Sequence, residues 1–375
     1  DDGNGYVDDW RGYDFYDDDN DVQAGLTNPN GSAVDHGTMV SGTIGASASN
    51  SAGGAGMTWA VKIMPLQIFS DDGEAYTSHV VEAIEYAVDN GARIINLSLG
   101  TNAADSALLT AVRYAKDNGV LVVAASGNCV GSSDPFCTAL PDTGRMLYPA
   151  NFSETLSVGA TTSSDTRASF SGYGTELDMV APGVSVGPLP TYAEGQTDVY
   201  ATASGTSFAT PMVSGTAALA LAENPDLTRD QLVTVLTESV QKVSAMSGSY
   251  RTDQLGQGRL NTYRAVLLAD AMGDTGQLGT TSIDVHQPPI GGMWRSLSGS
   301  VASDEWVLVG CRVAAAQICT ASVHGNTTVR YETDLKGKAG EIQYIFISGG
   351  SLPSGTSTLA VHSSEFGQAL TTLTR

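Results

Sequence analysis

Three short segments carry side chains that could perform nucleophilic chemistry together. Residues 35–42 place His36 among small residues, residues 124–128 end in Asn128 after an apolar run, and residues 204–211 place Ser207 at the start of a predicted helix. A serine hydroxyl becomes a good nucleophile when an imidazole accepts its proton. Unpaired N–H groups at a helix N-terminus, together with a side-chain amide, can stabilise the negative charge that develops on an attacked carbonyl.

Each of these segments also has an ordinary explanation. A lone histidine in a glycine-bordered loop is more often structural, and a lone Gly-Thr-Ser is usually a helix cap. Pro211 is compatible with a helix that begins near Ser207, because proline is tolerated in the first helical turn. All three segments occur here with their surrounding residues intact, and this combination favours one shared site.

The elements that must position these residues alternate between apolar runs and amphipathic stretches. The predicted strands are Val61–Phe69, Arg93–Leu99, Val120–Ala125 and Leu156–Ala160. The predicted helices are Thr77–Asn90, Asp105–Asn118, Ser207–Ala222, Thr228–Val240 and Asn261–Ala271. Strands without polar alternation, separated by single helices, predict a parallel sheet covered on both faces, with sites at the carboxyl ends of its strands.

The three segments resemble those of the subtilisin-like serine proteases, the subtilase family. Further similar segments occur at residues 63–66, 96–100, 148–150, 157–160 and 180–183, so the resemblance covers residues 1 to about 270. It implies an α/β fold of the subtilisin-like type, a doubly wound parallel sheet with helices on both faces. It also implies a serine endopeptidase that acts on proteins or peptides.

The resemblance assigns roles residue by residue. His36 is the expected general base, Ser207 the nucleophile and Asn128 the oxyanion donor. The expected substrate-binding walls are Ser98, Leu99 and Gly100 on one side and Ala125, Ser126 and Gly127 on the other. Because these walls carry no charge, we expect broad specificity with a large apolar or aromatic residue before the scissile bond. Met39 stands where the family often has a second histidine, and we expect it only to fill apolar space.

One member of the family's triad has no counterpart in this sequence. The family has an aspartate upstream of the histidine, in an Asp-Thr-Gly or Asp-Ser-Gly setting at the end of a strand, and no such motif precedes His36. Asp35 adjoins His36, where its side chain is expected to point elsewhere. We expect the aspartate to lie before residue 1, in a chain that is a processed form or an incomplete fragment. Loss of that carboxylate costs about 10⁴ in kcat, so the alternative is a catalytically impaired subtilase fold that acts as a binding or structural module.

The first nine residues resemble a calcium loop of the D-x-D-x-D-G-x-x-D type. Aligned on Gly5, the loop offers four oxygen ligands, from Asp2, Asn4, the Tyr6 carbonyl and Asp8. Closely spaced hard oxygen ligands suit Ca²⁺, and dense carboxylates repel one another without a cation. A solvated acidic loop is the alternative.

The composition changes near residue 273. We expect a subtilase-like catalytic domain over residues 1–272, a linker over 273–281 and a smaller C-terminal β-sandwich over 282–375, where the strands alternate apolar and polar residues. Trp294, Trp306 and Tyr331 could bind carbohydrate or another surface, but in a sandwich such aromatic residues more often belong to the core.

Charge and cysteine content set the remaining limits. Forty acidic and 18 basic residues give a net charge of −22, which argues against nucleic-acid or anionic-membrane partners. No apolar run is long enough to span a bilayer. The pairs Cys129/Cys137 and Cys311/Cys319 are each eight residues apart and lack zinc spacing, which favours two local disulfides in an extracellular protein over free thiols. We expect this protein to be a monomer.

Overall fold

A computed structural model describes most of the N-terminal 274 residues and the strands that follow them. The described parts are residues 4, 6, 9, 11–23, 35–70, 73–191, 199–247, 249 and 251–274, and the C-terminal strands given below. The chain divides into two compact units. One comprises Asp1–Leu219, Thr228–Thr237 and Arg251–Leu260, and the other Ala220–Leu227, Glu238–Tyr250 and Asn261–Arg375. All the predicted catalytic residues lie in the first unit.

A four-stranded parallel sheet forms the centre of the first unit. Its strands are β3 (Ile94–Leu97), β4 (Leu121–Ala125), β5 (Leu156–Thr161) and β6 (Met179–Pro182), in the order β3-β4-β5-β6. Every residue of β4 and β5 is buried, because both faces of these central strands are covered. This explains their continuous apolar sequences and confirms the predicted parallel α/β arrangement.

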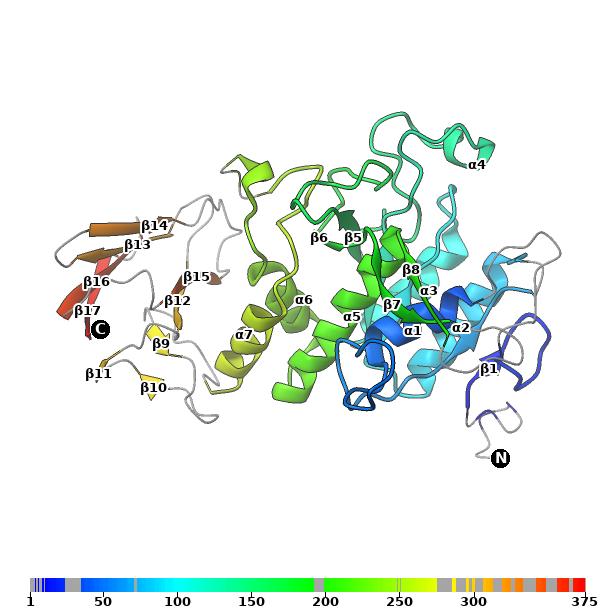
Figure 1. Ribbon diagram of the computed structural model, residues 1–375, viewed down its shortest axis with the longest axis horizontal. Helices are drawn as coiled ribbons and strands as arrows, with labels where there is room; N and C mark the ends of the chain where they lie inside the picture. The colour runs from blue at the N-terminus through cyan, green and yellow to red at the C-terminus, as the bar shows by residue number, and fades with distance from the viewer. Residues whose placement is uncertain are drawn as a thin grey trace. The chain divides into compact units, whose positions relative to one another are not determined.

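Two helices that alternate with the strands lie side by side, α2 (Thr77–Asp89) and α3 (Ser106–Asp117) (Figure 1). The side chain of Asp105 caps α3 by accepting hydrogen bonds from the N–H groups of Ala107 and Leu108, at 2.7 and 3.1 Å. Both helices end within one residue of the predicted boundary. The apolar spacing of each helix therefore agrees with its position in the fold.

The remaining elements of this unit include helices α1 (His36–Gly45), α5 (Thr206–Glu223) and α6 (Arg229–Glu238) and the hairpin β7 (Val186–Pro190)–β8 (Tyr200–Ala203). The sequence indicated α5 and α6, but not that residues 36–45 are helical, nor strands β6, β7 and β8. A buried cluster joins α1, the hairpin and α5, and consists of Met39, Val40, Leu189 and Phe208. Met39 therefore fills apolar space, as predicted.

The predicted strand Val61–Phe69 is much shorter than expected. Only β2 (Leu66–Gln67) forms, and it pairs in parallel with β1 (Tyr13–Asp14). Pro65 has no N–H to donate, and its carbonyl oxygen accepts from the Tyr13 N–H at 3.2 Å. Hydrogen bonding to β1 therefore begins at the Pro65 carbonyl and continues through Gln67.

Aromatic side chains anchor the N-terminal segment on α2. The rings of Tyr6, Tyr13, Phe15 and Tyr86 lie edge to face, with centroids 4.7–5.8 Å apart. The Tyr86 hydroxyl also donates to the Asp9 carboxylate at 2.5 Å. Tyr6, Tyr13 and Phe15 are thus held against the helix that precedes β3.

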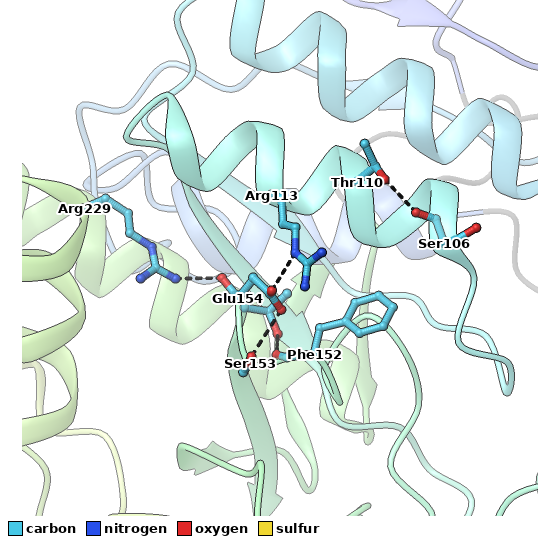
Figure 2. A network of polar contacts seen from close by, with 8 residues as sticks. Ser106, Thr110, Arg113, Phe152, Ser153, Glu154 and Arg229 are labelled. Carbon is cyan, nitrogen blue, oxygen red and sulfur yellow. Dashed lines mark hydrogen bonds and ion pairs between the residues drawn. The ribbon is translucent and has the colours of Figure 1, made fainter.

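A polar network positions the turn that leads into β5. Figure 2 shows Arg113 of α3 and Arg229 of α6 reaching Glu154 from two directions. Arg113 Nε donates to the Glu154 carboxylate at 2.8 Å, and Arg229 donates to the Glu154 carbonyl oxygen at 2.7 Å. Because Arg113 is largely exposed, the ion pair contributes at most about 1 kcal/mol. The two contacts together join α3 and α6 to the same turn.

The second unit contains α7 (Thr262–Asp274) and two C-terminal sheets. One sheet has the strand order β10-β9-β12-β15, and the other has the order β11-β17-β16-β13-β14. The strands are β9 (Val285–Gln287), β10 (Arg295–Ser296), β11 (Gly299–Ser300), β12 (Trp306–Arg312), β13 (Cys319–His324), β14 (Thr328–Glu332), β15 (Ile342–Ser348), β16 (Thr356–Ser363) and β17 (Gly367–Thr374). This part is β-rich, and its packing as a sandwich stays a prediction. Residues 275–281 of the predicted linker, Trp294, and the side chains of Trp306, Tyr331, Cys311 and Cys319 lie outside the described part.

Candidate active site

Ser207 lies in the first turn of α5, where helix N–H groups have no partner within the helix. The side chain is half-buried. Pro211 is the sixth residue of α5, whereas the sequence predicts it in the first turn. Proline has no N–H, so the carbonyl oxygen of Ser207 lacks the donor that an α-helix normally supplies four residues later. The Ser98 hydroxyl takes that place, donating to Ser207 O at 2.8 Å.

Asn128 is fixed by the residue before the serine. Its side-chain oxygen accepts hydrogen bonds from the N–H and the hydroxyl of Thr206, at 3.0 and 3.1 Å. The same hydroxyl accepts from the N–H of Gly127 at 3.2 Å. With its oxygen turned toward Thr206, the carboxamide directs its NH₂ group to the other side, and the residue is exposed to solvent.

The NH₂ group of Asn128 and the N–H of Ser207 flank the same backbone position. A β-carbon placed on Gly205 would lie 3.3 Å from Asn128 Nδ2 and 3.7 Å from Ser207 N. Two N–H donors thus lie near the same point, at the start of the helix that carries Ser207. Such a pair can bind the oxygen of a tetrahedral intermediate.

His36 is the first residue of α1 and lies beside the residue that follows the serine. Its ring contacts that of Phe208 edge to face, with the centroids 5.6 Å apart. The buried cluster of Met39 and Phe208 fixes the two helix N-termini relative to each other. The structure therefore brings together the three sequence segments that carry His36, Asn128 and Ser207.

The surroundings of His36 favour a neutral imidazole. Burial by neighbouring protein atoms lowers the pKa of His36 below its ordinary value, and the Asp35 carboxylate acts in the opposite direction. The residue nevertheless keeps an exposed face. Asp35 is buried, and one of its carboxylate oxygens has no hydrogen-bond partner among the described residues. Among the residues that the structure describes, none forms a hydrogen bond with the His36 imidazole.

The two predicted substrate walls lie at the carboxyl ends of two neighbouring strands. Ser98, Leu99 and Gly100 follow β3, whereas Ala125, Ser126 and Gly127 end β4 and continue from it, and β3 pairs with β4 in parallel. Cys129 and Cys137 form the predicted disulfide, with their Cα atoms 5.0 Å apart. The disulfide begins one residue after Asn128 and so closes the loop that directly follows the carboxamide.

The predicted calcium ligands are described only in part. Asp2 and Asp8 lie outside the described residues. Asn4 Oδ1 accepts from the Tyr6 N–H at 2.9 Å, which closes a turn, and Asn4 Nδ2 donates to Asp9 at 2.7 Å. Among the residues that the structure describes, no group of three or more His, Cys, Asp or Glu side chains could hold a metal ion. Asp9 is engaged by Tyr86, whose hydrogen bond lowers the pKa of the Asp9 carboxyl.

The sequence did not predict two contacts that position the site: those of Thr206 with Asn128 and of the Ser98 hydroxyl with the Ser207 carbonyl. A signal for the second exists in the sequence, because Pro211 follows Ser207 by four residues and removes one helix donor. No comparable signal exists for Thr206, whose hydroxyl bonds both to Asn128 and to the Gly127 N–H across a separation of 78 and 79 residues.

The parallel α/β sheet places an imidazole, a serine at a helix N-terminus and a hydrogen-bonded carboxamide near one another. This combination is typical of serine hydrolases. The comparisons with known proteins identify the family. The Subtilase family model matches residues 3–264. The chain belongs to the subtilase family.

Individual relatives agree with this assignment. Subtilisin NAT of Bacillus subtilis subsp. natto is 39% identical over 207 residues, which cover 55% of this chain and 50% of that protein. Subtilisin BL of Lederbergia lenta is 38% identical over 230 residues, which cover 61% of this chain and 77% of the relative. The chain thus spans about half the length of several curated relatives that it matches.

Two solved structures share the fold. A protease from Pseudoalteromonas arctica PAMC 21717 superposes with a TM-score of 0.56 at 26% identity, over 69% of this chain and 83% of that one. A cold-adapted subtilisin-like serine proteinase gives a TM-score of 0.52 at 33% identity, over 67% of this chain and 81% of that one.

Thr206→Val tests whether Thr206 positions Asn128. The variant removes one of the two donors to Asn128 Oδ1 and the acceptor of the Gly127 N–H. Because a net hydrogen bond is worth about 1 kcal/mol, we expect kcat for a peptide ester to fall about fivefold to tenfold, with little change in KM and with rescue by Thr206→Ser. Thr210→Val is the matched control, since the Thr210 hydroxyl donates to a carbonyl of its own helix, Thr206 O. Equal losses of kcat in both valine variants would contradict the positioning role.

Proposed function

We propose that this chain forms the catalytic core of a secreted serine endopeptidase that cleaves peptide bonds through an acyl-enzyme. Ser207 is the nucleophile, His36 the general base and Asn128 an oxyanion donor. The observation that carries the proposal is the pair of hydrogen bonds that orients the Asn128 carboxamide. Thr206 binds Asn128 Oδ1 from two atoms, and this leaves the NH₂ group beside the Ser207 N–H.

The reaction follows from these positions. His36 accepts the hydroxyl proton as Ser207 Oγ bonds to the substrate carbonyl carbon, and the Asn128 NH₂ and the Ser207 N–H bind the resulting oxyanion. The C–N bond then breaks, and the imidazolium gives its proton to the leaving amine. A water molecule, deprotonated by His36, attacks the acyl-enzyme and releases Ser207.

The substrate is an extended peptide that lies between the walls at residues 98–100 and 125–127. Binding by strand addition uses main-chain hydrogen bonds and therefore accepts many sequences. The walls carry no charged side chain, which favours an apolar residue before the scissile bond. The disulfide Cys129–Cys137 supports an extracellular enzyme, and the net charge of −22 argues against nucleic-acid or anionic-membrane partners. We propose that the enzyme acts as a monomer. None of the described helices is long and apolar enough to cross a membrane.

The competing function is an impaired fold that serves as a binding or structural module. The observation in its favour is that no described carboxylate forms a hydrogen bond with His36. A triad without its carboxylate leaves the tautomer and the charge of the imidazole unsupported. The two functions differ in whether Ser207 reacts.

A fluorophosphonate reagent separates them. Its phosphorus forms a bond to an activated serine oxygen and releases fluoride, so labelling measures nucleophile activation directly. In the full-length protein we expect stoichiometric labelling of Ser207, located by peptide mass spectrometry, and none in Ser207→Ala. An unlabelled Ser207 in protein whose near-UV circular dichroism shows a folded state would support the binding module instead.

The pH dependence should report His36. Activity requires a neutral imidazole, so kcat/KM falls as the pH decreases through the His36 pKa. The Asp35 carboxylate raises that pKa by stabilising the imidazolium, and Asp35→Asn should therefore shift the acidic limb of the profile to lower pH. Asp105→Asn is the control, because Asp105 is not among the charges acting on His36. A shift to higher pH in Asp35→Asn would contradict the assignment of the limb to His36.

We also propose a structural Ca²⁺ held by Asp2, Asn4, the Tyr6 carbonyl and Asp8. The turn closed by Asn4 and Tyr6 supports a compact loop, and the engagement of Asp9 by Tyr86 agrees with its absence from this ligand set. Ca²⁺ at 100 times its dissociation constant should stabilise the fold by about 2.7 kcal/mol. We expect a higher Tm with Ca²⁺ than with Mg²⁺, and no Ca²⁺ effect in Asp2→Asn/Asp8→Asn. The control Asp21→Asn should keep the response, and a response retained in the double variant would refute the ligand set.

A further inference from the structure

The aromatic ring of Phe208 lies beside both the imidazole and the two oxyanion donors. Its centroid is 5.6 Å from that of the His36 ring, and the two ring planes are inclined by 63°. A β-carbon placed on Gly205 would lie 3.6 Å from Phe208 Cδ2. The NH₂ group of Asn128 and the N–H of Ser207 flank that same position. One side chain therefore contacts the predicted general base and borders the point where the donors meet.

Packing from three elements holds the Phe208 ring in place. Phe208 is buried at the start of α5, in a cluster with Met39 and Val40 of α1 and Leu189 of β7. Figure 1 shows α1, α5 and the hairpin β7–β8 in the same part of the fold. The Phe208 N–H also donates to Gly205 O at 3.1 Å. Because a closely packed interior leaves a side chain few alternative rotamers, the ring is a fixed surface for its neighbours.

The His36 ring has few other constraints on its orientation. Within the described part of the chain it forms no hydrogen bond, and the residue keeps an exposed face. Packing on the covered side is therefore what can orient the imidazole, and Phe208 supplies an aromatic contact there. The energy of an edge-to-face contact depends on the angle between the two rings, so such a contact favours one relative orientation.

We propose that Phe208 is a positioning residue for the general base, and that its ring holds the His36 imidazole in the orientation that accepts the Ser207 proton. This inference rests on the proposed peptidase function and adds a residue to its mechanism. A fixed aromatic surface limits the rotation of the imidazole, so the ring needs less rearrangement to reach the geometry of proton transfer.

The same contact keeps water away from one side of the imidazole. Burial is the main cause that lowers the pKa of His36, and the adjoining Asp35 carboxylate acts in the opposite direction. The cluster residues that α1, α5 and the hairpin contribute beside Phe208 are apolar. Removal of the ring should therefore change the His36 pKa through access of water and not through loss of a charge.

Phe208→Leu tests the proposal, because it keeps an apolar side chain but removes the ring. We expect kcat for a peptide ester to fall about threefold to tenfold, the range that an aromatic pair contributes, with little change in KM. The acidic limb of the kcat/KM profile should move to higher pH, because water that reaches the imidazole reduces the effect of burial. Leu189→Ala is the matched control. It removes apolar atoms from the same cluster without removing the ring, and it should keep the position of the limb.

NMR of protein with labelled histidine and phenylalanine provides a measurement that requires no activity. We expect a nuclear Overhauser effect between the rings of His36 and Phe208 in the unmodified protein, with the histidine signal assigned by its loss in His36→Gln. The His36 pKa from these spectra should rise in Phe208→Leu and stay unchanged in Leu189→Ala.

Two results would overturn the proposal: no Overhauser effect between the two rings, or equal changes of the His36 pKa in Phe208→Leu and Leu189→Ala. The first concerns the unmodified protein, so it decides the question even if Phe208→Leu does not fold. Fluorophosphonate labelling of Ser207 tests the proposed function separately. If Ser207 is labelled while the spectra are not as expected, only the role of Phe208 fails; if folded protein is not labelled, the proposed function fails, and the role of Phe208 in it as well.

Discussion

The site depends on the hydrogen bonds that join Thr206 to the end of β4. The Thr206 N–H and hydroxyl bind Asn128 Oδ1, and the hydroxyl also accepts from Gly127. This arrangement fixes the loop after a central strand to the N-terminus of α5, although the two are separated by 78 residues in sequence. Because the strand end is buried and the helix start has unpaired N–H groups, each supplies partners that the other lacks. The orientation of the carboxamide follows from these bonds and does not require a bound substrate.

Pro211 shows how a local irregularity of the helix contributes to the same arrangement. A proline inside α5 leaves Ser207 O without a helical donor, and the Ser98 hydroxyl donates to it from the end of β3. Asn96 of β3 accepts from Ser214, two turns further along α5, and donates to Ser98. The serine-bearing turn is therefore tied to β3 as well as to β4. Its position is fixed by two neighbouring strands of the sheet.

The sequence predicted what local patterns determine. Continuous apolar runs located β4 and β5 to within one residue, the amphipathic pattern located α3 to within one residue, and the three motif segments identified the residues that converge. Features that depend on distant partners were missed. Residues 36–45 are helical although their small residues give no clear amphipathic pattern, and β2 is short because Pro65 limits its pairing with a strand far upstream in the sequence. The packing of Leu147 against Gly100 and Gly127 could not be predicted from sequence, because these contacts exist only after folding.

The segment from Asn128 to Leu147 links the Asn128 carboxamide to the buried cluster of Cys129, Cys137, Leu140 and Leu147. Its first residue supplies the carboxamide, its last residue packs against Gly100 and Gly127, and the disulfide and Leu140 lie in one buried cluster with Leu147. A change in the packing of this cluster therefore acts both on Gly100 and Gly127 and on the segment that carries Asn128. The carboxamide is additionally held by Thr206, whereas the leucine side chain is held by packing and by its own backbone bonds. Substitutions in the cluster should for this reason displace Leu147 more readily than the Asn128 carboxamide, because only the carboxamide is tied directly to α5.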